Sequence, residues 1–424
     1  MFDLIVVGGG AAGFYGAIQT ALANPKLKIA IFERGKTVLG KVKISGGGRC
    51  NVTHAEFEPH ALSENYPRGQ KELLGPFHSY ATGDTMGFFE ERGVPLKIEA
   101  DGRIFPKSDS SASIIECFLE EAKKLGISVL KNSGAKNIQK SNEIADGWQV
   151  TTANKHYHCH KLLLATGSNP KIWALLKGLG HSIISPVPSL FTFNCKDARI
   201  QGLQGLSTHA IVDIMPKTHY NPQIKIQLKS KVEREPLFTE EGPLLITHWG
   251  FSGPAVLKLS AWAAKELNGF HYNFRVRINW LPEYSLGTMV GFLNEMKFAE
   301  ARKTILKSKV FELPNRLWVR LVKAAGINTT QKWADISKNQ IQALASELTE
   351  GSFKIEGKST FKEEFVTAGG VDLKEINFKT FESKLLPNLY LAGEIINVDA
   401  ITGGFNFQNA WTGAYLTAQA IAKN

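Results

Sequence analysis

The feature that most constrains this chain is its N-terminal stretch, Met1–Phe14, in which a short apolar run leads directly into a glycine-rich turn. Asp3–Val7 is rich in apolar, β-branched residues, as expected of a central parallel strand buried on both faces. Gly8, Gly10 and Gly13 follow with G-x-G-x-x-G spacing. In this pattern the first glycine permits a tight turn, the second lets backbone approach a pyrophosphate, and the third lets a helix pack closely on the strand.

The residues after this turn support a dinucleotide-binding βαβ unit. Ala11 and Ala12 begin the expected helix, whose free N–H groups and positive dipole end favour phosphate. Lys28–Phe32 is predicted to be the second strand and ends at Glu33, twenty residues beyond Gly13. A carboxylate at that place accepts hydrogen bonds from a ribose hydroxyl. Together these features favour a nucleotide site over a tight turn beside a surface glutamate.

Composition narrows the class of protein further. The 424 residues predict two or three domains, and 43% hydrophobic with 21% charged residues is typical of a soluble globular protein. No apolar stretch approaches the ~18 residues of a membrane span, and the N-terminus has no signal-peptide pattern. The four cysteines, Cys50, Cys117, Cys159 and Cys195, include no C-x-x-C pair. We therefore expect a cytoplasmic protein without structural zinc or a redox dithiol.

The net charge of +11 has three possible meanings. It can reflect anionic cofactor sites, a surface that binds nucleic acid, or only a basic surface. Charge alone does not decide among them.

A second glycine motif, Gly40–Asn51, reads GKVKISGGGRCN. Its three consecutive glycines predict an irregular loop rather than a helix or strand. The loop groups backbone N–H groups with a hydroxyl, a guanidinium and an amide, a set that suits a polyanion or an acceptor-rich heterocycle. Residues 52–110 are also expected to be irregular, whereas Ser110–Leu125 predicts an amphipathic helix and Ile127–Leu130 a strand.

Three stretches make a family resemblance specific: GGGAAG near the start, KISGGGRCN after the first βαβ unit, and TGGFNFQNAWTGAYLTAQAIA at the end. Together they resemble the BaiN-like family of bacterial NAD(P)/FAD-dependent oxidoreductases, within the two-dinucleotide-binding-domain flavoprotein superfamily. The resemblance covers essentially the whole chain. It implies FAD, with its pyrophosphate at the first glycine turn, its adenosine ribose on Glu33, and the second glycine loop beside pyrophosphate and isoalloxazine. The residues so assigned in the N-terminal part are Gly8, Gly10, Ala11, Ala12, Gly13, Glu33, Arg34, Gly40, Lys41, Lys43, Ser45, Gly46, Gly47, Arg49, Cys50 and Asn51.

The resemblance also implies contacts from later strand ends. An A-T-G sequence closes the strand Lys161–Ala165, and a glycine–acid pair follows the strand Leu389–Ala392. A glycine-rich segment then begins the helix Ala410–Ala422, whose dipole would stabilise negative charge on reduced flavin. For Cys50 we expect a packing role, because no resolving cysteine lies near it in sequence. The residues assigned to the cofactor here are Ala135, Ala165, Thr166, Gly167, Gly393, Glu394, Asp399, Gly403, Gly404, Phe405, Asn406 and Gln408.

The predicted fold class is α/β: a discontinuous Rossmann-like FAD-binding domain, an inserted β-rich domain and a small helical subdomain. The FAD-binding domain is expected over 1–188 and 353–424, the β-rich insert over 189–284 and the helical subdomain over 285–352. Phe353–Ile355 is taken as the return to the flavin domain. Strands of the insert are expected at Phe191–Asn194, His209–Met215, Ile224–Leu228 and Leu244–His248.

The expected activity is hydride transfer between flavin N5 and a small or medium organic substrate, as in reduction of a conjugated C=C bond. An amine or amino-acid oxidase remains an alternative. An RNA-associated flavoprotein is another, because of the net charge and the basic helices, although nucleic acid is the less favoured partner. Without a second G-x-G-x-x-G, NAD(P)H is expected only as a transient electron donor. No metal is expected, and no side chain is singled out as a catalytic acid or base.

Overall fold

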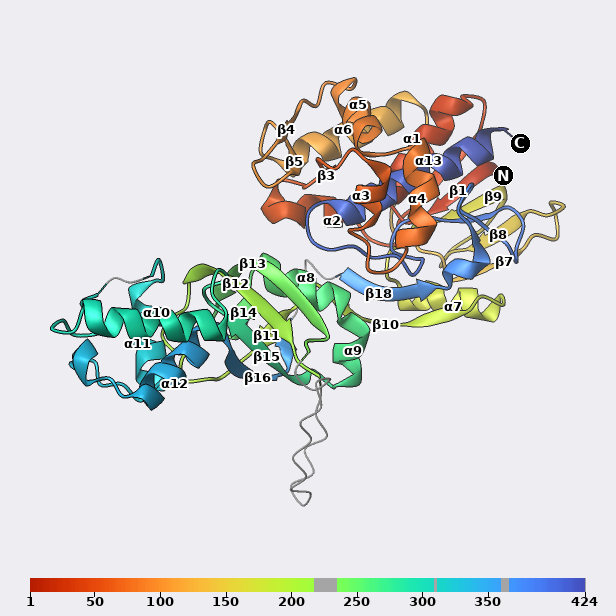
Figure 1. Cartoon of the computed structure of the whole chain (residues 1–424). Coiled ribbons are helices and arrows are strands. Elements are labelled where there is room, and N and C mark those ends of the chain that lie inside the picture. The colour runs from red at the N-terminus through yellow and green to blue at the C-terminus, as the bar shows by residue number, and fades with distance from the viewer. Residues whose placement is uncertain (217–234, 309–310, 360–365, 424) are drawn as a thin grey trace, which may run out of the picture. The chain divides into compact units, whose positions relative to one another are not determined.

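The computed structural model describes residues 1–216, 235–308, 311–359 and 366–423 (Figure 1). Contacts between residues divide the chain into two units. The first unit combines Met1–Ser189 with Lys362–Asn424, and the second is Leu190–Phe361. The two ends of the chain therefore fold together, and the middle of the chain forms its own unit.

The first unit is built on a parallel sheet with the order β6-β2-β1-β9-β21. Each of these strands pairs in parallel with its neighbours. The order reverses beside β1, so the carboxyl ends of these strands form the edge at which doubly wound sheets bind nucleotides. The predicted Rossmann-like fold is confirmed. The strands are β1 (Phe2–Val7), β2 (Ile29–Phe32), β6 (Ser128–Leu130), β9 (His156–Leu164) and β21 (Leu389–Leu391).

Antiparallel strands extend this sheet, and a separate two-stranded ladder accompanies it. The hairpin β7 (Asn137–Lys140) and β8 (Trp148–Thr151) pairs with β9, while β20 (Glu382–Ser383) joins β19 (Ile376–Asn377) to β21. After α7 (Pro170–Gly178), the ladder pairs β10 (Ile183–Ser189) with β18 (Val366–Val371).

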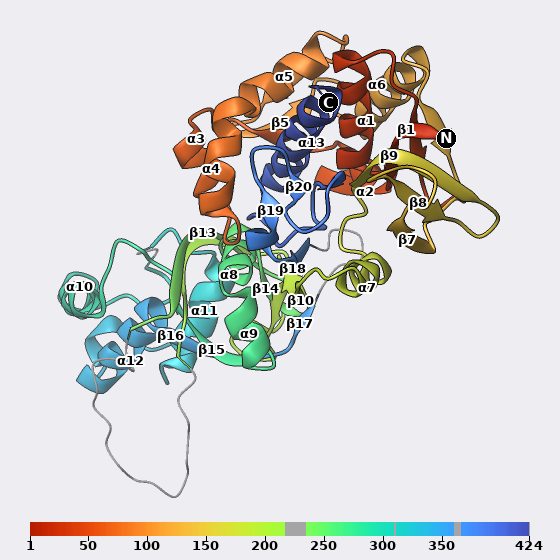
Figure 2. The same ribbon diagram turned by 90° about the vertical axis from the view of Figure 1, so that its right-hand side faces the viewer.

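Helices α1 (Ala11–Ala23) and α13 (Phe405–Lys423) lie side by side in both views (Figures 1 and 2). Gly16 makes this close packing possible, because a Cβ there would lie 2.8 Å from Leu163 of the sheet and 3.6 Å from Ala414 of α13. The predicted amphipathic helix is α6 (Ser111–Lys124), which packs against α1.

The expectation of an irregular second glycine motif was wrong for its first half. Gly40–Ile44 forms the short helix α2, and Ser45–Gly48 forms a 3₁₀ turn. Val42 is fully buried and anchors the helix. Gly46 and Gly47 have φ of +57° and +68°, which is the left-handed region that glycine tolerates.

Residues 52–110 were also wrongly expected to be irregular. They form three helices and a three-stranded antiparallel sheet with the order β3-β5-β4. Burial of Phe77, Phe88 and Phe89 stabilises this region, and Phe88 and Phe89 contact distant parts of the chain such as Tyr15 and Trp411. Its elements are β3 (Thr53–His54), α3 (Pro59–Ser63), α4 (Gln70–Ser79), α5 (Thr82–Glu90), β4 (Leu96–Ile98) and β5 (Arg103–Pro106).

The second unit contains a seven-stranded antiparallel sheet with the order β16-β15-β12-β13-β14-β11-β17, as the predicted β-rich insert requires. The expected strand Ile224–Leu228 lies outside the described residues. The strands are β11 (Thr192–Asn194), β12 (Ser207–Ile214), β13 (Phe238–Ile246), β14 (Gly250–Ser252), β15 (Asn273–Asn279), β16 (Gly351–Glu356) and β17 (Lys358–Ser359).

The helices of the second unit share one hydrophobic core with this sheet. Trp280, Leu344 and Phe353 all belong to that core. Assigning Phe353–Ile355 to the flavin domain was wrong, because Phe353 and Ile355 pair with Val276 and Phe274 of β15. The helices are α8 (Pro254–Trp262), α9 (Ala264–Gly269), α10 (Leu286–Ala299), α11 (Asn315–Ala324) and α12 (Lys338–Thr349).

Candidate cofactor site

The glycine turn after β1 leaves one face open and closes the other against the sheet. Gly8 has φ of +115°, and a Cβ there would lie 2.3 Å from the carbonyl oxygen of Ala165. A Cβ on Gly13 would lie 1.9 Å from the carbonyl oxygen of Gly8. A Cβ on Gly10, by contrast, would meet no atom within 4 Å. The fold itself requires Gly8 and Gly13, whereas Gly10 borders open space.

The N-terminus of α1 is a potential anion site. The backbone N–H groups of Ala11, Ala12 and Gly13 have no acceptor within the described part of the chain. The helix has 13 residues and carries no acidic side chain in its first turn. Its positive dipole end, with three free N–H groups, therefore suits a phosphate group.

Glu33 extends from the end of β2 toward the same turn. Its Oε2 accepts a hydrogen bond from the N–H of Gly9 at 2.9 Å, and its Oε1 accepts one from the N–H of Gly35 at 2.7 Å. These two bonds hold the half-buried carboxylate in place and leave further lone pairs on both oxygens. Arg34 lies beside the segment that follows β6, because a Cβ on Gly134 would lie 2.7 Å from the Arg34 Cβ. Ala135 is the next residue of that segment.

The ends of β9 and β21 meet on the same edge. A Cβ on Gly167, which has φ of +60°, would lie 3.5 Å from Oε2 of Glu394. The Lys41 Nζ is 2.5 Å from the same Glu394 oxygen, and this ion pair joins α2 to the end of β21. Gly393 itself packs near α1, with a Cβ position 3.3 Å from Ala12. The ends of β2, β6, β9 and β21 and the helix α2 are therefore brought together around the glycine turn.

The start of α13 packs against β3 and the second glycine motif. A Cβ on Gly404 would lie 2.6 Å from the Thr53 carbonyl and 2.9 Å from Oδ1 of Asn51. The backbone N–H groups of Phe405 and Asn406 have no acceptor among the residues that the structure describes. Gly404 is thus required by the chain's own packing, and the helix start presents free donors.

Several predicted cofactor residues are occupied by internal contacts instead. The Asn406 side chain bonds both the N–H and the carbonyl of Ala400, which closes the turn before α13. Gln408 is fully buried, and its Oε1 accepts from Thr53 Oγ1 at 2.6 Å and from Thr85 Oγ1 at 3.0 Å. These side chains hold α13 in position.

Asp399 is completely buried and forms a two-pronged ion pair with Arg68. Ser189 Oγ donates to the same carboxylate at 2.9 Å. Burial raises the pKa of Asp399 above its ordinary value, and the guanidinium of Arg68 opposes that shift. Arg68 and Ser189 were not identified from the sequence, since nothing near them in the chain indicates a partner at position 399.

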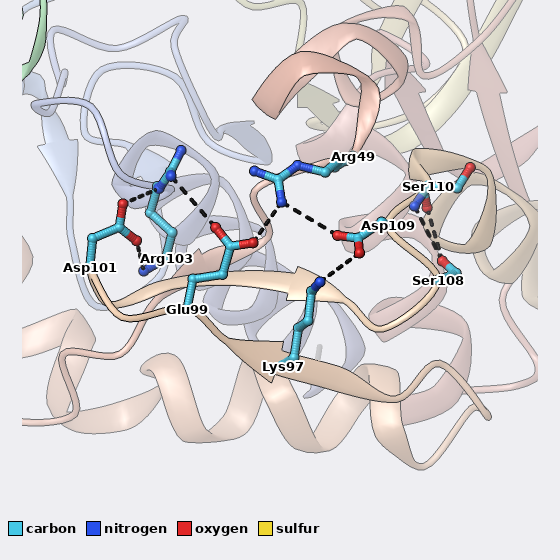
Figure 3. Close-up of polar contacts among 8 residues, drawn as sticks. All are labelled: Arg49, Lys97, Glu99, Asp101, Arg103, Ser108, Asp109 and Ser110. Atoms are coloured by element: carbon cyan, nitrogen blue, oxygen red, sulfur yellow. Dashed lines mark hydrogen bonds and ion pairs between the residues drawn. The ribbon is translucent and has the colours of Figure 1, made fainter. Parts of the chain in front are cut away.

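Arg49 belongs to an ionic cluster on the small sheet of β3, β4 and β5 (Figure 3). Its Nη1 lies 2.6 Å from Glu99 and 3.4 Å from Asp109, and its guanidinium stacks 3.8 Å from the centre of the Phe105 ring. Lys97 pairs with Asp109 at 2.6 Å. The guanidinium therefore anchors the end of the second glycine motif. Two other residues of this motif were also assigned to the cofactor. The Lys43 side chain is exposed, and Ser45 Oγ donates a hydrogen bond to the carbonyl of Val42.

Cys50 is completely buried at the end of this motif. Burial raises the pKa of its thiol to about 12. A neutral, enclosed thiol is a poor nucleophile, which fits the packing role expected from the sequence.

Three buried polar atoms around this edge have no hydrogen-bond partner within the described ranges: Asn51 Oδ1, Thr166 Oγ1 and Asn397 Oδ1. Buried polar atoms are normally satisfied, so these three remain available to the polar groups of a ligand. A free helix start, an acid after β2 and these atoms fit FAD, a long molecule with a phosphate centre and many polar groups. Asn397 was missed from sequence because it lies outside the glycine–acid motif.

Two further findings concern metals and membranes. Within the described ranges, no group of three or more histidine, cysteine, aspartate or glutamate side chains is arranged to hold a metal ion. None of the described helices is both long enough and apolar enough to span a bilayer.

Comparison with known proteins finds one matching family and individual relatives that span the chain. The HI0933-like protein Rossmann domain family matches residues 2–420. A ribosomal RNA dihydrouridine synthase of Escherichia coli (strain K12) is 31% identical over 433 residues, covering 99% of this chain and 98% of that protein. A 3-dehydro-bile acid delta(4,6)-reductase of Clostridium scindens is 26% identical, covering 99% and 98%. The crystal structure of a 3-ketosteroid delta1-dehydrogenase from Sterolibacterium denitrificans superposes with a TM-score of 0.50 at 10% identity, covering 100% of this chain and 99% of that one, and this likeness concerns the fold alone.

Proposed function

Since this chain belongs to the HI0933-like family, whose members are FAD-binding Rossmann-fold oxidoreductases, we propose that it reduces a C=C bond conjugated to a carbonyl, in uridine of ribosomal RNA. The proposed substrate rests on the match to the ribosomal RNA dihydrouridine synthase, which spans nearly the full length of both proteins. The expected small-molecule oxidoreductase thereby becomes the second candidate.

The two relatives point to the same reaction type. Dihydrouridine differs from uridine by one hydride and one proton added across C5=C6, which is conjugated to the C4 carbonyl. A 3-keto, delta(4,6) compound also has double bonds conjugated to its carbonyl. One active-site chemistry would therefore serve both substrate classes, and this reaction type is the common element of the proposal.

When bound, FAD would supply the hydride at its N5 position. The residues of this chain would bind and orient it. We propose that the free N–H groups at Ala11–Gly13 hold the pyrophosphate, that Glu33 accepts the ribose hydroxyls, and that Arg34 and Ala135 lie beside the adenine. The N-terminus of α13 would favour negative charge on the reduced ring system, because its first N–H groups are free.

We also propose that NAD(P)H is the transient electron donor and that the enzyme is cytoplasmic. The test is anaerobic incubation of the purified protein with NADH or NADPH and ribosomal RNA from cells that lack the gene. Mass spectrometry of the digested nucleosides should then show a uridine that has gained two hydrogen atoms.

The alternatives have distinct outcomes in the same assay. Unmodified RNA together with reduction of a 3-keto, delta(4,6) steroid acid would overturn the RNA substrate and support the second candidate, which the relative at 26% identity favours. Hydrogen peroxide released on addition of amines or amino acids would instead support the oxidase alternative.

A further inference from the structure

The second unit carries a large aromatic side chain on a rigid turn. Trp249 is 60% exposed and lies between β13 and β14. Thr247 donates from its N–H to the carbonyl of Gly250 at 2.7 Å, and the Trp249 carbonyl accepts from the N–H of Cys195 at 2.9 Å. Gly250 has φ of +141°, and a Cβ there would lie 2.2 Å from the Phe193 carbonyl, so the turn packs closely on β11 and has no room for a larger residue at this position. The indole is held outward on fixed backbone.

Hydrogen bonds connect this turn to the segment that carries Lys196 and to Arg316 and Arg320 of α11. Lys196 follows Cys195, whose N–H bonds the turn. The Lys196 carbonyl accepts a hydrogen bond from Gln201 Nε2 at 3.2 Å. The Gln201 carbonyl in turn accepts from Arg320 Nη2 at 3.0 Å, and Arg316 Nη1 lies 3.4 Å from the Gly202 carbonyl. Arg316 and Arg320 lie one helical turn apart on α11 and are exposed.

The charges of these three basic residues are not cancelled by ion pairs. Lys196, Arg316 and Arg320 form no salt bridge with any carboxylate that the structure describes, and both arginines bond backbone carbonyls instead. Acidic groups in this region have other basic partners, although the Glu356 carboxylate also interacts electrostatically with Lys196. Asp197 and Glu347 pair with Arg199, and Glu356 pairs with Lys354.

We propose that Trp249, Lys196, Arg316 and Arg320 form one binding surface for single-stranded RNA, which we call the Trp249 surface. A nucleobase stacks on the exposed indole, and the backbone phosphates bind the three cations. The rigid turn lowers the ordering cost of the aromatic contact. Single-stranded RNA is favoured over a protein partner because the surface joins one stacking platform to three basic side chains that form no salt bridge among the described residues. This inference deepens the RNA substrate proposed above and rests on it.

The test measures binding of a fluorescein-labelled twelve-nucleotide oligouridylate to the FAD-loaded protein at several salt concentrations. Trp249→Ala should weaken binding roughly 5- to 150-fold, the range for loss of one base–aromatic stack. The double variant Arg316→Gln/Arg320→Gln should reduce the slope of log K against log salt by about 1.4, since each lost phosphate contact on single-stranded nucleic acid contributes about 0.7. Retained FAD absorbance and an unchanged unfolding temperature establish that each variant is folded.

Two matched variants control for aromatic exposure and for total charge. Phe298→Ala removes another aromatic side chain, 82% exposed, on α10, which none of these hydrogen bonds reaches. Lys26→Gln/Lys123→Gln removes two exposed charges of the first unit, the same number as Arg316→Gln/Arg320→Gln. Both should bind oligouridylate as the unmodified protein does. Wild-type affinity in Trp249→Ala, or equal losses in the control variants, would overturn the Trp249 surface.

The outcome is separable from that of the proposed reaction. If the unmodified protein binds oligouridylate through Trp249 but forms no dihydrouridine, the surface stands and the proposed reaction fails. If it forms dihydrouridine in ribosomal RNA while Trp249→Ala binds and reacts normally, the reaction stands and this surface is wrong.

Discussion

Replacing Gly10 by alanine separates binding of the cofactor from folding of the protein. A methyl group at this position would meet no atom of the protein within 4 Å, and its φ of −96° is open to any residue. Gly10 caps α1, and glycine is a better N-cap than alanine, so the cofactor-free protein should lose no more than about 1 kcal/mol. Only a ligand lying on the glycine turn can clash with the new methyl group.

We therefore expect Gly10→Ala to weaken FAD binding by about 1–3 kcal/mol, the usual cost of overpacking, which corresponds to roughly 5- to 150-fold in Kd. At saturating FAD a hundredfold weaker Kd removes about 2.7 kcal/mol of ligand-induced stability. Calorimetric titration of the cofactor-free protein gives Kd, and urea denaturation with and without FAD gives the two stabilities.

Gly13→Ala and Gly87→Ala provide the contrast. A Cβ on Gly13 would lie 1.9 Å from a backbone oxygen, so this variant should lose at least about 3 kcal/mol even without FAD. Gly87 lies inside α5 with no atom within 4 Å of its Cβ position, and alanine there should add up to about 1 kcal/mol through helix propensity. An unchanged FAD affinity in Gly10→Ala would refute the placement of the pyrophosphate on this turn.

Three further predictions follow from individual contacts. Glu33→Ala should weaken FAD by about 1–3 kcal/mol, the worth of a hydrogen bond to a charged group, and calorimetry that finds equal affinity would exclude a ribose contact. Asp399→Asn should lower the free energy of unfolding by about 3–5 kcal/mol in urea titrations, because Arg68 keeps its charge in a largely buried place; a loss below about 1 kcal/mol would contradict this. Burial raises the pKa of the Cys50 thiol to about 12, so the folded protein should resist iodoacetamide up to pH 9 by mass spectrometry. Because that folded-state pKa lies above the unfolded value of about 8.5, the contribution of Cys50 to stability is present below pH 8.5 and declines as pH rises toward 12. Rapid alkylation of the folded protein would contradict this prediction, because it would show that the thiol is accessible.

The sequence by itself determined the parts of this protein that depend on local pattern. The run before Gly8, the spacing of the three glycines and the acid at the end of the next strand predict a βαβ nucleotide unit, since each signal needs only neighbours in the chain. The confirmed Rossmann fold contains that unit, with β1 and β2 paired in parallel and Gly8 and Gly13 at positions where a Cβ would strike backbone.

Only the tertiary structure decided which motif residues remain available to a ligand. Asp399 and Gln408 belong to motifs that the resemblance assigns to the cofactor, yet Asp399 pairs with Arg68 across 331 residues and Gln408 with Thr53 across 355. The pairing of Phe353 with β15 is decided in the same way. Hydrogen bonds and burial between distant segments leave no periodic signal in the sequence. They appear only when the sheet and helices bring those segments together.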